Sequence, residues 1–425
     1  MRFLSSKIFA MKIQATFLFL LYPLLASLQP KCDAISTGYI PINDLGTEIS
    51  PLTGKMGGLY LNGSNDMPAE HLKAGLELSS QIQCLDISGN PDATNGKIVW
   101  LSIGMSNCTQ ETQQFIRQAN ASPSKNPKLV LVDGAQGGQT ANVISTPTHN
   151  NYLTFWNTVN TRLANAGVGK NQVQVIWFKE ANPAGSTPPG VHYDSLVVQF
   201  RRCMNEIKTR FPNVKLCYMA SRISGRYASS NLNPEPYAYL TGWAVKQTIE
   251  DQIMGLPQVA FKGSEAKSPW LSWGMYMWSD GDNPQKNNPD VFYTCPADFQ
   301  NDGTHPSTLG AQKVGALLLK FFSNDKTASP WFLGSGCTTT VNSADQIISD
   351  LVKIYPNPGN GLFNLESDKE IESLELFNLY GLKLNYKITS AVKSTQIDLS
   401  DLKKGVYLLH VKCSNSSQTK KVVIQ

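Results

Sequence analysis

The apolar residues between about residue 96 and residue 322 follow two patterns that alternate along the chain. Nearly continuous apolar runs, which are typical of strands covered on both faces, span 97–104, 127–134, 173–179 and 214–220. Apolar residues at helical spacing come between and after them and span 109–120, 152–166, 193–210 and 309–322. Strands and helices in regular alternation predict an α/β domain of three layers, with helices on both faces of a parallel sheet.

The rest of the chain has different patterns. Residues 35–95 are rich in Gly, Asn and Pro without a clean period, which predicts an irregular extension that packs on the α/β domain. A linker is expected over 333–346, where Gly, Ser and Thr are frequent. Residues 347–425 alternate apolar and polar positions between turns, which predicts an antiparallel β-sandwich of about seven strands. We therefore expect two domains, the larger one spanning 35–332.

The N-terminus has the order of features found in a secretory signal peptide. Basic residues precede an apolar run over 15–28, and small and polar residues follow it. We expect a leader over 1–34 that starts at Met1 or Met11, and the alternative is an uncleaved N-terminal anchor. No other segment reaches the roughly 18 apolar residues that a membrane-spanning helix needs, so no integral membrane segment is expected after cleavage.

The eight cysteines fit an exported chain, because disulfides persist outside the cytoplasm. Cleavage after Ala34 would remove Cys32 and leave seven, so at least one would stay free or pair between chains. Cys203 and Cys217 are the first pair expected, since one lies on a predicted helix and the other on the strand that follows. The cysteine spacings match no zinc site.

The charge of the chain excludes some partners. The formal net charge of +5 is small for 425 residues, and the basic residues are spread along the sequence. Such a distribution supplies no concentrated positive field. Neither nucleic acid nor an anionic lipid surface is therefore expected as a partner.

Polar residues able to do chemistry follow the predicted strands, at the sheet edge where parallel sheets bind ligands. Ser106 follows the first strand and precedes a helix, whose N-terminus favours developing negative charge. Gly138 lies in a Gly-Gly pair after the second strand, where backbone can approach a substrate oxygen and donate its N–H group. Asn182 follows the third strand and offers a side-chain amide to the same oxygen.

The motif Asp302-Gly-Thr-His305-Pro lies on a loop before the last predicted helix. An Asp three residues ahead of a His in a tight turn can orient the imidazole, which then takes the Ser106 proton as a general base. Among the five histidines, His305 alone has such a local carboxylate. Each motif taken singly also fits an ordinary turn or helix cap. Their occurrence together at strand ends is what points to a hydrolase.

The four motifs, in this order, resemble the SGNH hydrolase superfamily of esterases and acyl hydrolases, which has a flavodoxin-like fold. The Gly-x-Ser-Asn form around Ser106 departs from the usual Gly-Asp-Ser and is similar to carbohydrate acetylesterases, and the usual Gly-x-Asn-Asp is missing around Asn182. The resemblance implies a catalytic triad of Ser106, His305 and Asp302. It also implies an oxyanion hole that includes Gly138 and Asn182, and no metal or cofactor.

Further residues are weaker candidates for contact with a substrate. Trp273 and Trp278 belong to an aromatic cluster that either stacks on sugars at a cleft rim or packs in the core. Arg222 follows the fourth strand, where it either binds an anionic substituent or lies on a solvated loop. Glu180 is a possible second acid, although Lys179 beside it indicates an ordinary surface pair.

The C-terminal segment carries a second resemblance. Its motifs are Lys-Ile-Tyr-Pro-Asn-Pro from residue 353, Leu-Glu-Leu-Phe-Asn-Leu-Tyr-Gly from 374, Gly-Val-Tyr-Leu-Leu from 405 and a closing Lys-Lys-Val-Val-Ile-Gln. Together they resemble the type IX secretion sorting domains of Bacteroidetes, and an unrelated carbohydrate-binding module is the alternative. The resemblance implies that the type IX machinery is a partner and that the protein is secreted or attached to the cell surface.

These patterns predict a secreted serine esterase. Export, the Gly-x-Ser-Asn form and the tryptophans favour an ester substrate, expected to be an acetylated glycan. The alternative is a non-catalytic surface protein that binds glycans or mediates adhesion through an inactive α/β scaffold. Reaction with a fluorophosphonate probe separates the two, because only an activated serine reacts with it.

Overall fold

The structure of the protein is a computed structural model, and its main feature is a five-stranded parallel sheet. It describes residues 29–337 and 352–425, except for 368–369, 379–382, 391–393 and 414–415. The strand order is β2-β1-β3-β4-β5, and all neighbouring strands are parallel. The strands are β1 (Ile98–Gly104), β2 (Leu129–Asp133), β3 (Val173–Lys179), β4 (Leu216–Ala220) and β5 (Trp270–Met275).

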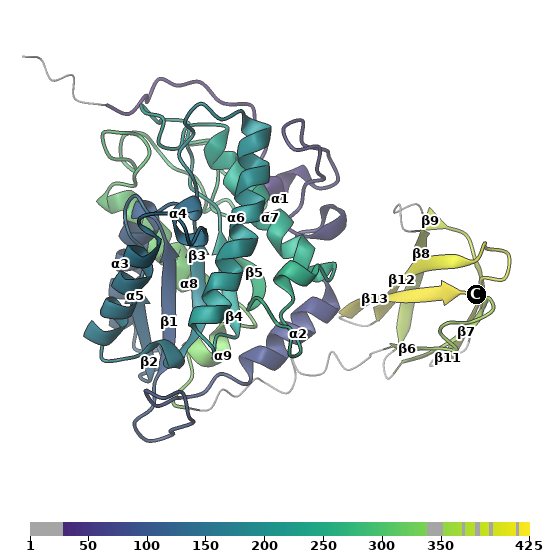
Figure 1. The fold of residues 1–425 in the computed structure, drawn as a ribbon. Helices are drawn as coiled ribbons and strands as arrows, with labels where there is room; N and C mark the ends of the chain where they lie inside the picture. The colour runs from purple at the N-terminus through teal and green to yellow at the C-terminus, as the bar shows by residue number, and fades with distance from the viewer. Residues whose placement is uncertain (1–28, 338–351, 368–369, 379–382, 391–393, 414–415) are drawn as a thin grey trace, which may run out of the picture.

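Helices cover both faces of this sheet (Figure 1). The longer ones are α2 (Ala69–Ser79), α3 (Ser106–Ala121), α5 (Tyr152–Asn165), α6 (Pro189–Arg210), α7 (Tyr237–Ile253) and α8 (Thr308–Asn324). The shorter ones are α1 (Ile42–Leu45), α4 (Ala141–Ser145), α9 (Ser329–Phe332) and the 3-10 helices η1 (Leu61–Gly63), η2 (Lys170–Gln172) and η3 (Pro257–Val259). The predicted three-layer α/β/α architecture is confirmed, with a flavodoxin-like strand order.

Each strand sends alternate side chains into two cores. In β1, Val99, Leu101 and Ile103 pack with residues of α4, α5, α6 and α7. Ile98 and Trp100 pack on the opposite face with residues of α3, α8 and α9. Every residue of β1 is therefore buried, which explains why the strand appears in the sequence as an unbroken apolar run.

Among the strands and longer helices of the α/β domain, the sequence pattern does not predict three, which are α2, α7 and β5. Residues buried in the protein lie on nearly all sides of α7, so its apolar residues show no helical period. β5 lies within the aromatic cluster, where the ring residues hide the strand pattern. α2 lies in the extension expected to be irregular, and its buried face includes polar and small residues such as His71 and Ser79. That composition weakens the period that would have identified it.

Two disulfides tie peripheral segments to the α/β domain. One joins Cys32 to Cys295, and the other joins Cys84 to Cys337. Cleavage of the leader after Ala34 would remove Cys32 and leave Cys295 without its partner. A leader that ends before Cys32 preserves the bond.

The expected disulfide between Cys203 and Cys217 is wrong, because both thiols are free and buried. Both side chains lie in the same apolar core but contact other groups. The Cys203 sulfur lies 3.9 Å from the Ala141 carbonyl oxygen, and the Cys217 sulfur lies 3.8 Å from the Met204 sulfur. Neighbouring elements in the sequence thus bring two cysteines into one core without aligning them for a bond.

The C-terminal part forms two four-stranded antiparallel sheets, in the orders β10-β11-β7-β6 and β13-β12-β8-β9. The strands are β6 (Val352–Tyr355), β7 (Leu362–Ser367), β8 (Ile371–Asn378), β9 (Lys383–Leu384), β10 (Lys387–Ser390), β11 (Ser394–Asp398), β12 (Gly405–Cys413) and β13 (Ser416–Ile424). Phe363 and Leu365 of one sheet share a core with Leu376 and Leu409 of the other. This arrangement is the predicted β-sandwich.

Several expectations fall on residues outside this description. They concern most of the leader, residues 338–346 of the expected linker and residues 347–351 of the expected C-terminal domain. Within the described ranges, no helix combines the length and the apolar character that crossing a membrane requires. The described part of the expected linker contains Cys337, which its disulfide holds against Cys84.

Candidate active site

Ser106 occupies the first position of α3, directly after β1. Gly104 ends the strand at the point where α3 and β3 come close together. A side chain at Gly104 would place its Cβ 2.3 Å from the Lys179 carbonyl oxygen and 2.5 Å from Cys108 Cβ, so only glycine fits. In the sheet, β1 lies between β2 and β3. The chain runs from β1 to β2 on one side of β1 and then crosses to β3 on the other side. Ser106 therefore lies at the switch point of the sheet, where parallel sheets bind ligands.

The structure brings Ser106 together with His305 and Asp302, although 199 positions separate Ser106 from His305. Ser106 Oγ lies 2.7 Å from His305 Nε2, and His305 Nδ1 lies 2.5 Å from Asp302 Oδ2. The carboxylate is the natural acceptor for a proton on Nδ1, and this tautomer leaves Nε2 free to accept the Ser106 proton. The three side chains thus form a continuous chain of hydrogen bonds that can carry a proton away from the serine.

The turn from Asp302 to His305 holds this arrangement. Asp302 Oδ1 accepts the backbone N–H groups of Thr304 and His305, each at 2.9 Å. Gly303 has a φ of +63°, and a Cβ there would lie 1.8 Å from the Tyr227 carbonyl oxygen. A residue with a side chain therefore cannot replace it without moving the turn.

The surroundings of Asp302 favour the ionised form of its carboxyl group. Burial acts to raise the pKa of its carboxyl group, but hydrogen bonds from the backbone and side chain of His305 and from the Thr304 N–H group outweigh burial and lower that pKa. An ionised carboxylate is the stronger acceptor for the His305 Nδ1 proton.

The loop after β2 comes close to Ser106 at Gly137. A Cβ added to Gly137 would lie 3.7 Å from Ser106 Cβ, whereas one added to Gly138 would meet nothing within 4 Å. Within the described ranges, the N–H groups of Gly137 and Gly138 donate to no protein acceptor. The loop is held in place because the Ala135 carbonyl accepts hydrogen bonds from Thr109 Oγ1 and Arg162 Nη1. The sequence singled out Gly138 of this pair, whereas a Cβ at Gly137 is the one that would lie near the serine.

Asn182 lies on the loop after β3, and its side chain already has protein partners. Its Nδ2 donates to Gln199 Oε1 at 2.6 Å, and its Oδ1 accepts the Asn142 N–H at 3.2 Å. One of the two N–H groups on Nδ2 is thus committed to Gln199. A contact with a substrate oxygen would have to use the other one.

Arg222 is neither on a solvated loop nor exposed to an anionic substituent, since only 3% of its surface is accessible. The guanidinium donates from Nη2 to the Thr304 carbonyl at 3.2 Å. Asn107, which follows the serine in α3, donates from Nδ2 to the same oxygen at 2.9 Å. Two buried side chains from different elements therefore fix the loop that carries His305. Neither role has a signal in the sequence, because both depend on contacts between distant segments.

The aromatic cluster belongs to the core. Trp273 and Trp278 are 4% and 0% exposed, so the expectation that they stand at a cleft rim is wrong. Trp273 Nε1 donates to the Leu59 carbonyl, and Trp278 Nε1 donates to Glu235 Oε1, each at 2.7 Å. Their polar atoms are satisfied inside the protein, as is usual for buried tryptophan.

Lys179 and Glu180 do not form a surface pair, because both are buried. Lys179 Nζ instead lies 2.5 Å from a carboxylate oxygen of Glu111. Burial raises the pKa of the Glu180 carboxyl group well above its usual value. Glu180 Oε2 accepts the Ala181 N–H group, which places this carboxyl group against the backbone of the loop after β3.

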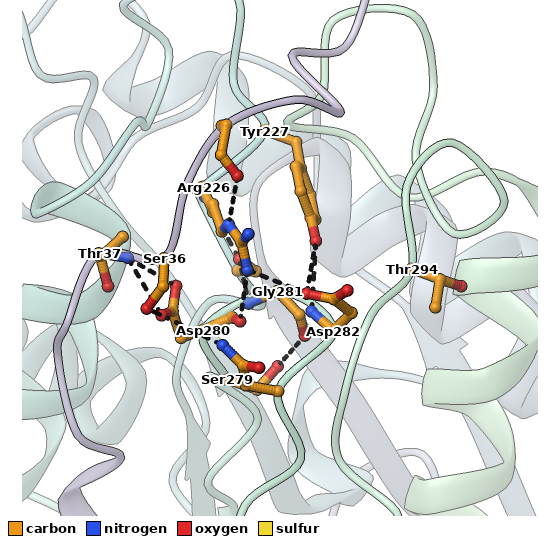
Figure 2. A network of polar contacts seen from close by, with 12 residues as sticks. Ser36, Thr37, Arg226, Tyr227, Ser279, Asp280, Gly281, Asp282 and Thr294 are labelled. Atoms are coloured by element: carbon orange, nitrogen blue, oxygen red, sulfur yellow. Dashed lines mark hydrogen bonds and ion pairs between the residues drawn. The ribbon is translucent and has the colours of Figure 1, made fainter.

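A polar network fastens the N-terminal segment to the loop that supports Asp302 (Figure 2). The Asp280 carboxylate accepts hydrogen bonds from Ser36 Oγ and the Thr37 N–H group. Arg226 donates from Nη1 to the Asp280 carbonyl at 3.2 Å and forms an ion pair with Asp282 at 2.9 Å. The loop that carries Arg226 continues to Ser229, whose N–H group donates to the Asp302 carbonyl at 2.9 Å. Residues near the expected leader junction therefore contribute to the site indirectly.

We expect Asn107→Ala to lower kcat for an aryl acetate about tenfold with little change in KM. The variant removes one of two hydrogen bonds to the Thr304 carbonyl, so His305 is less well held for proton transfer, while substrate contacts are untouched. Steady-state kinetics measures the two constants separately. The matched control is Asn126→Ala, because Asn126 is also buried and donates to backbone carbonyls, but at the opposite end of the sheet. An equal loss of kcat in both variants would contradict a positioning role for Asn107.

Comparison with known families identifies the C-terminal module. Residues 353–425 match the secretion system C-terminal sorting domain. The match confirms the second resemblance seen in the sequence, and it shows that the chain carries the signal for export to the cell surface or the exterior. No curated protein matches the chain by sequence.

Solved structures match this chain at low identity and with low TM-scores. A carbohydrate acetylesterase from Xanthomonas citri is 9% identical, with a TM-score of 0.31 over 77% of this chain and 79% of that chain. A candidate acylhydrolase from Bacteroides fragilis is 13% identical, with a TM-score of 0.32 over 60% of this chain and 97% of that chain. A gut microbial diltiazem-metabolising enzyme is 13% identical, with a TM-score of 0.31 over 72% of this chain and 70% of that chain. Similarity at this level carries no argument about activity, which rests on the site itself.

Proposed function

We propose that this protein is a secreted serine esterase of the SGNH type, with Ser106 as nucleophile, His305 as general base and Asp302 as the group that orients the base. The observation that carries the proposal is the pair of hydrogen bonds at 2.7 Å and 2.5 Å that links the three side chains. A serine, an imidazole and a carboxylate in this order are the parts that acyl transfer requires.

The reaction proceeds in two steps. Ser106 Oγ attacks the ester carbonyl carbon while His305 Nε2 takes the hydroxyl proton, and the same nitrogen then returns the proton to the departing alcohol. A water molecule, deprotonated by His305, then attacks the acyl carbon on Ser106. The bond between that carbon and Ser106 Oγ breaks, the carboxylic acid leaves, and His305 returns the proton to Ser106 Oγ. The scheme uses only groups of the chain and water.

The negative oxygen that forms in each step needs donors on the other side of the serine. The Ser106 N–H group is available because the first N–H groups of a helix have no acceptor within it. Gly138 contributes its N–H group, and Gly137 lies close enough to the serine to contribute as well. Asn182 supplies the N–H group of its side chain that Gln199 does not use.

We propose an O-acetyl ester on a glycan as the substrate. The sorting domain delivers the chain to the outside of the cell, where such esters are met. The Gly-x-Ser-Asn form around Ser106 also favours a small acyl group, by its similarity to carbohydrate acetylesterases. Acetate release from acetylated xylan and other acetylated glycans measures this directly. Release of long acyl chains with none of acetate would replace this substrate class with a lipid ester.

A fluorophosphonate probe tests the proposal against a non-catalytic glycan-binding role. We expect the probe to bind covalently at Ser106, because the His305 and Asp302 side chains activate this hydroxyl above all others. Intact-mass measurement and peptide mapping locate the adduct. A full-length, folded protein that takes up no probe and releases no acetate would favour the inactive scaffold.

A further inference from the structure

A cavity of about 570 Å³ lies along β5, apart from the serine site. β5 is the edge strand of the sheet, and β3 and β4 separate it from β1. At the usual strand spacing of about 4.8 Å, β5 is roughly 14 Å from β1, the strand that precedes Ser106. Its lining includes neither Ser106 nor His305. The volume is in the range of cavities that bind small molecules.

The cavity has an aromatic floor and a rim of carboxamides. Buried Tyr60, Trp273 and Tyr276 line it from within, and Tyr60 Oη lies 3.2 Å from Ser272 Oγ. The rim is polar and includes the side chains of Asn65, Asn287, Asn288 and Asn324. Tyr60 and Asn65 belong to the N-terminal extension. Aromatic rings and carboxamides are the groups that take up the apolar face and the hydroxyl groups of a sugar.

Asn43, also on the lining, holds an unsatisfied polar atom. It is 5% exposed, and its Nδ2 donates to Gln285 Oε1 at 2.9 Å. Its Oδ1 is buried and has no hydrogen-bond partner among the described residues. The Asn43 backbone carbonyl accepts hydrogen bonds from Asn65 and Asn287, so the side chain is held in a fixed position. A buried acceptor without a donor costs free energy, which a ligand hydroxyl group would recover.

The two charged side chains on the lining, Lys320 and Asp325, already have protein partners. Lys320 Nζ pairs with Asp290 at 2.6 Å. Asp325 accepts hydrogen bonds from the Thr327 N–H group at 2.9 Å and from its hydroxyl at 2.6 Å. The uncharged groups left to meet a ligand on this lining are the side-chain oxygen of Asn43 and those carboxamide atoms of the rim that no protein group occupies. The chemistry fits a neutral ligand that carries several hydroxyl groups.

We propose that this cavity is a glycan-binding site that takes a neutral pyranose residue, separate from the site of ester cleavage. Asn43 Oδ1 accepts a hydrogen bond from a sugar hydroxyl, the rim carboxamides bind further hydroxyl groups, and the aromatic floor packs against the C–H face. The inference does not rest on the proposed esterase activity, because binding at β5 involves none of the triad residues.

Saturation-transfer NMR on the full-length protein tests this inference with the methyl glycosides of glucose, galactose, mannose, xylose and N-acetylglucosamine. We expect at least one glycoside to bind the unaltered protein. Asn324→Trp puts an indole on the rim from the exposed last residue of α8, and we expect it to weaken that binding about tenfold or more. Asn165→Trp is the matched control, because Asn165 is the exposed last residue of α5 and is not on the cavity lining.

The unfolding temperatures of both variants are compared with that of the unaltered protein, so that a loss of binding can be told from a loss of folded protein. Ser106→Ala is expected to bind the glycoside as the unaltered protein does, so failure of the esterase proposal and failure of this inference are distinguishable. If no glycoside of the panel binds at millimolar concentration, or if Asn324→Trp binds as tightly as Asn165→Trp, the inference is overturned.

Discussion

Replacing Ser106 with alanine is expected to lower kcat for aryl acetate hydrolysis by a factor on the order of 10⁶. The serine hydroxyl is the group that would attack the ester, and among the described residues no other group hydrogen-bonds to His305 Nε2. His305→Ala should lose about as much, since the two groups act as a unit, and the double variant should be no worse than either single one. Asp302→Asn keeps the shape of the turn but stabilises the wrong tautomer of His305, and it should lower kcat by a factor on the order of 10⁴.

A matched control exists on the same helix. Ser122→Ala changes a serine at the opposite end of α3 and should retain full turnover. Initial rates with 4-nitrophenyl acetate, corrected for spontaneous hydrolysis, provide the measurement. If Ser106→Ala and Ser122→Ala hydrolyse the substrate at the same rate, the serine mechanism is wrong.

The fold could be predicted where burial follows one simple pattern. β1 and β3 are buried along their whole length, so each appears as an apolar run that needs no knowledge of its neighbours. α7 could not be predicted in this way, because a helix buried on nearly all sides has no polar face. β5 was hidden for a related reason, since the tryptophans that pack it into the core also suggested a surface for sugars.

The site could be predicted where its geometry is local. Asp302 and His305 share one turn, and their contact follows from the sequence between them. The roles of Arg222 and Asn107 could not be predicted, because both act on a carbonyl oxygen that belongs to a distant loop. The choice of Cys203 as a disulfide partner was wrong for the same physical reason. Proximity along the chain does not determine the direction in which a side chain points.

Replacing Glu111 with glutamine is expected to lower the free energy of unfolding of the α/β domain by about 3–5 kcal/mol. Lys179 Nζ lies 2.5 Å from the Glu111 carboxylate, and the two side chains are 1% and 0% exposed. Burial lowers the pKa of Lys179, and the Glu111 charge opposes that shift. Without the carboxylate, the ammonium group is left buried and uncompensated, or it has to give up its proton. Urea unfolding measures the difference.

Tryptophan fluorescence makes this measurement specific to the α/β domain, because all eight tryptophans precede residue 332. Asp290→Asn is the control, since the Lys320–Asp290 pair is exposed and its loss should change stability by no more than about 1 kcal/mol. Replacing both partners, in a Glu111→Leu and Lys179→Met double variant, should recover most of the lost stability, because no buried charge then remains. A double variant as unstable as Glu111→Gln would show that the loss comes from packing around α3 and not from an unpaired charge.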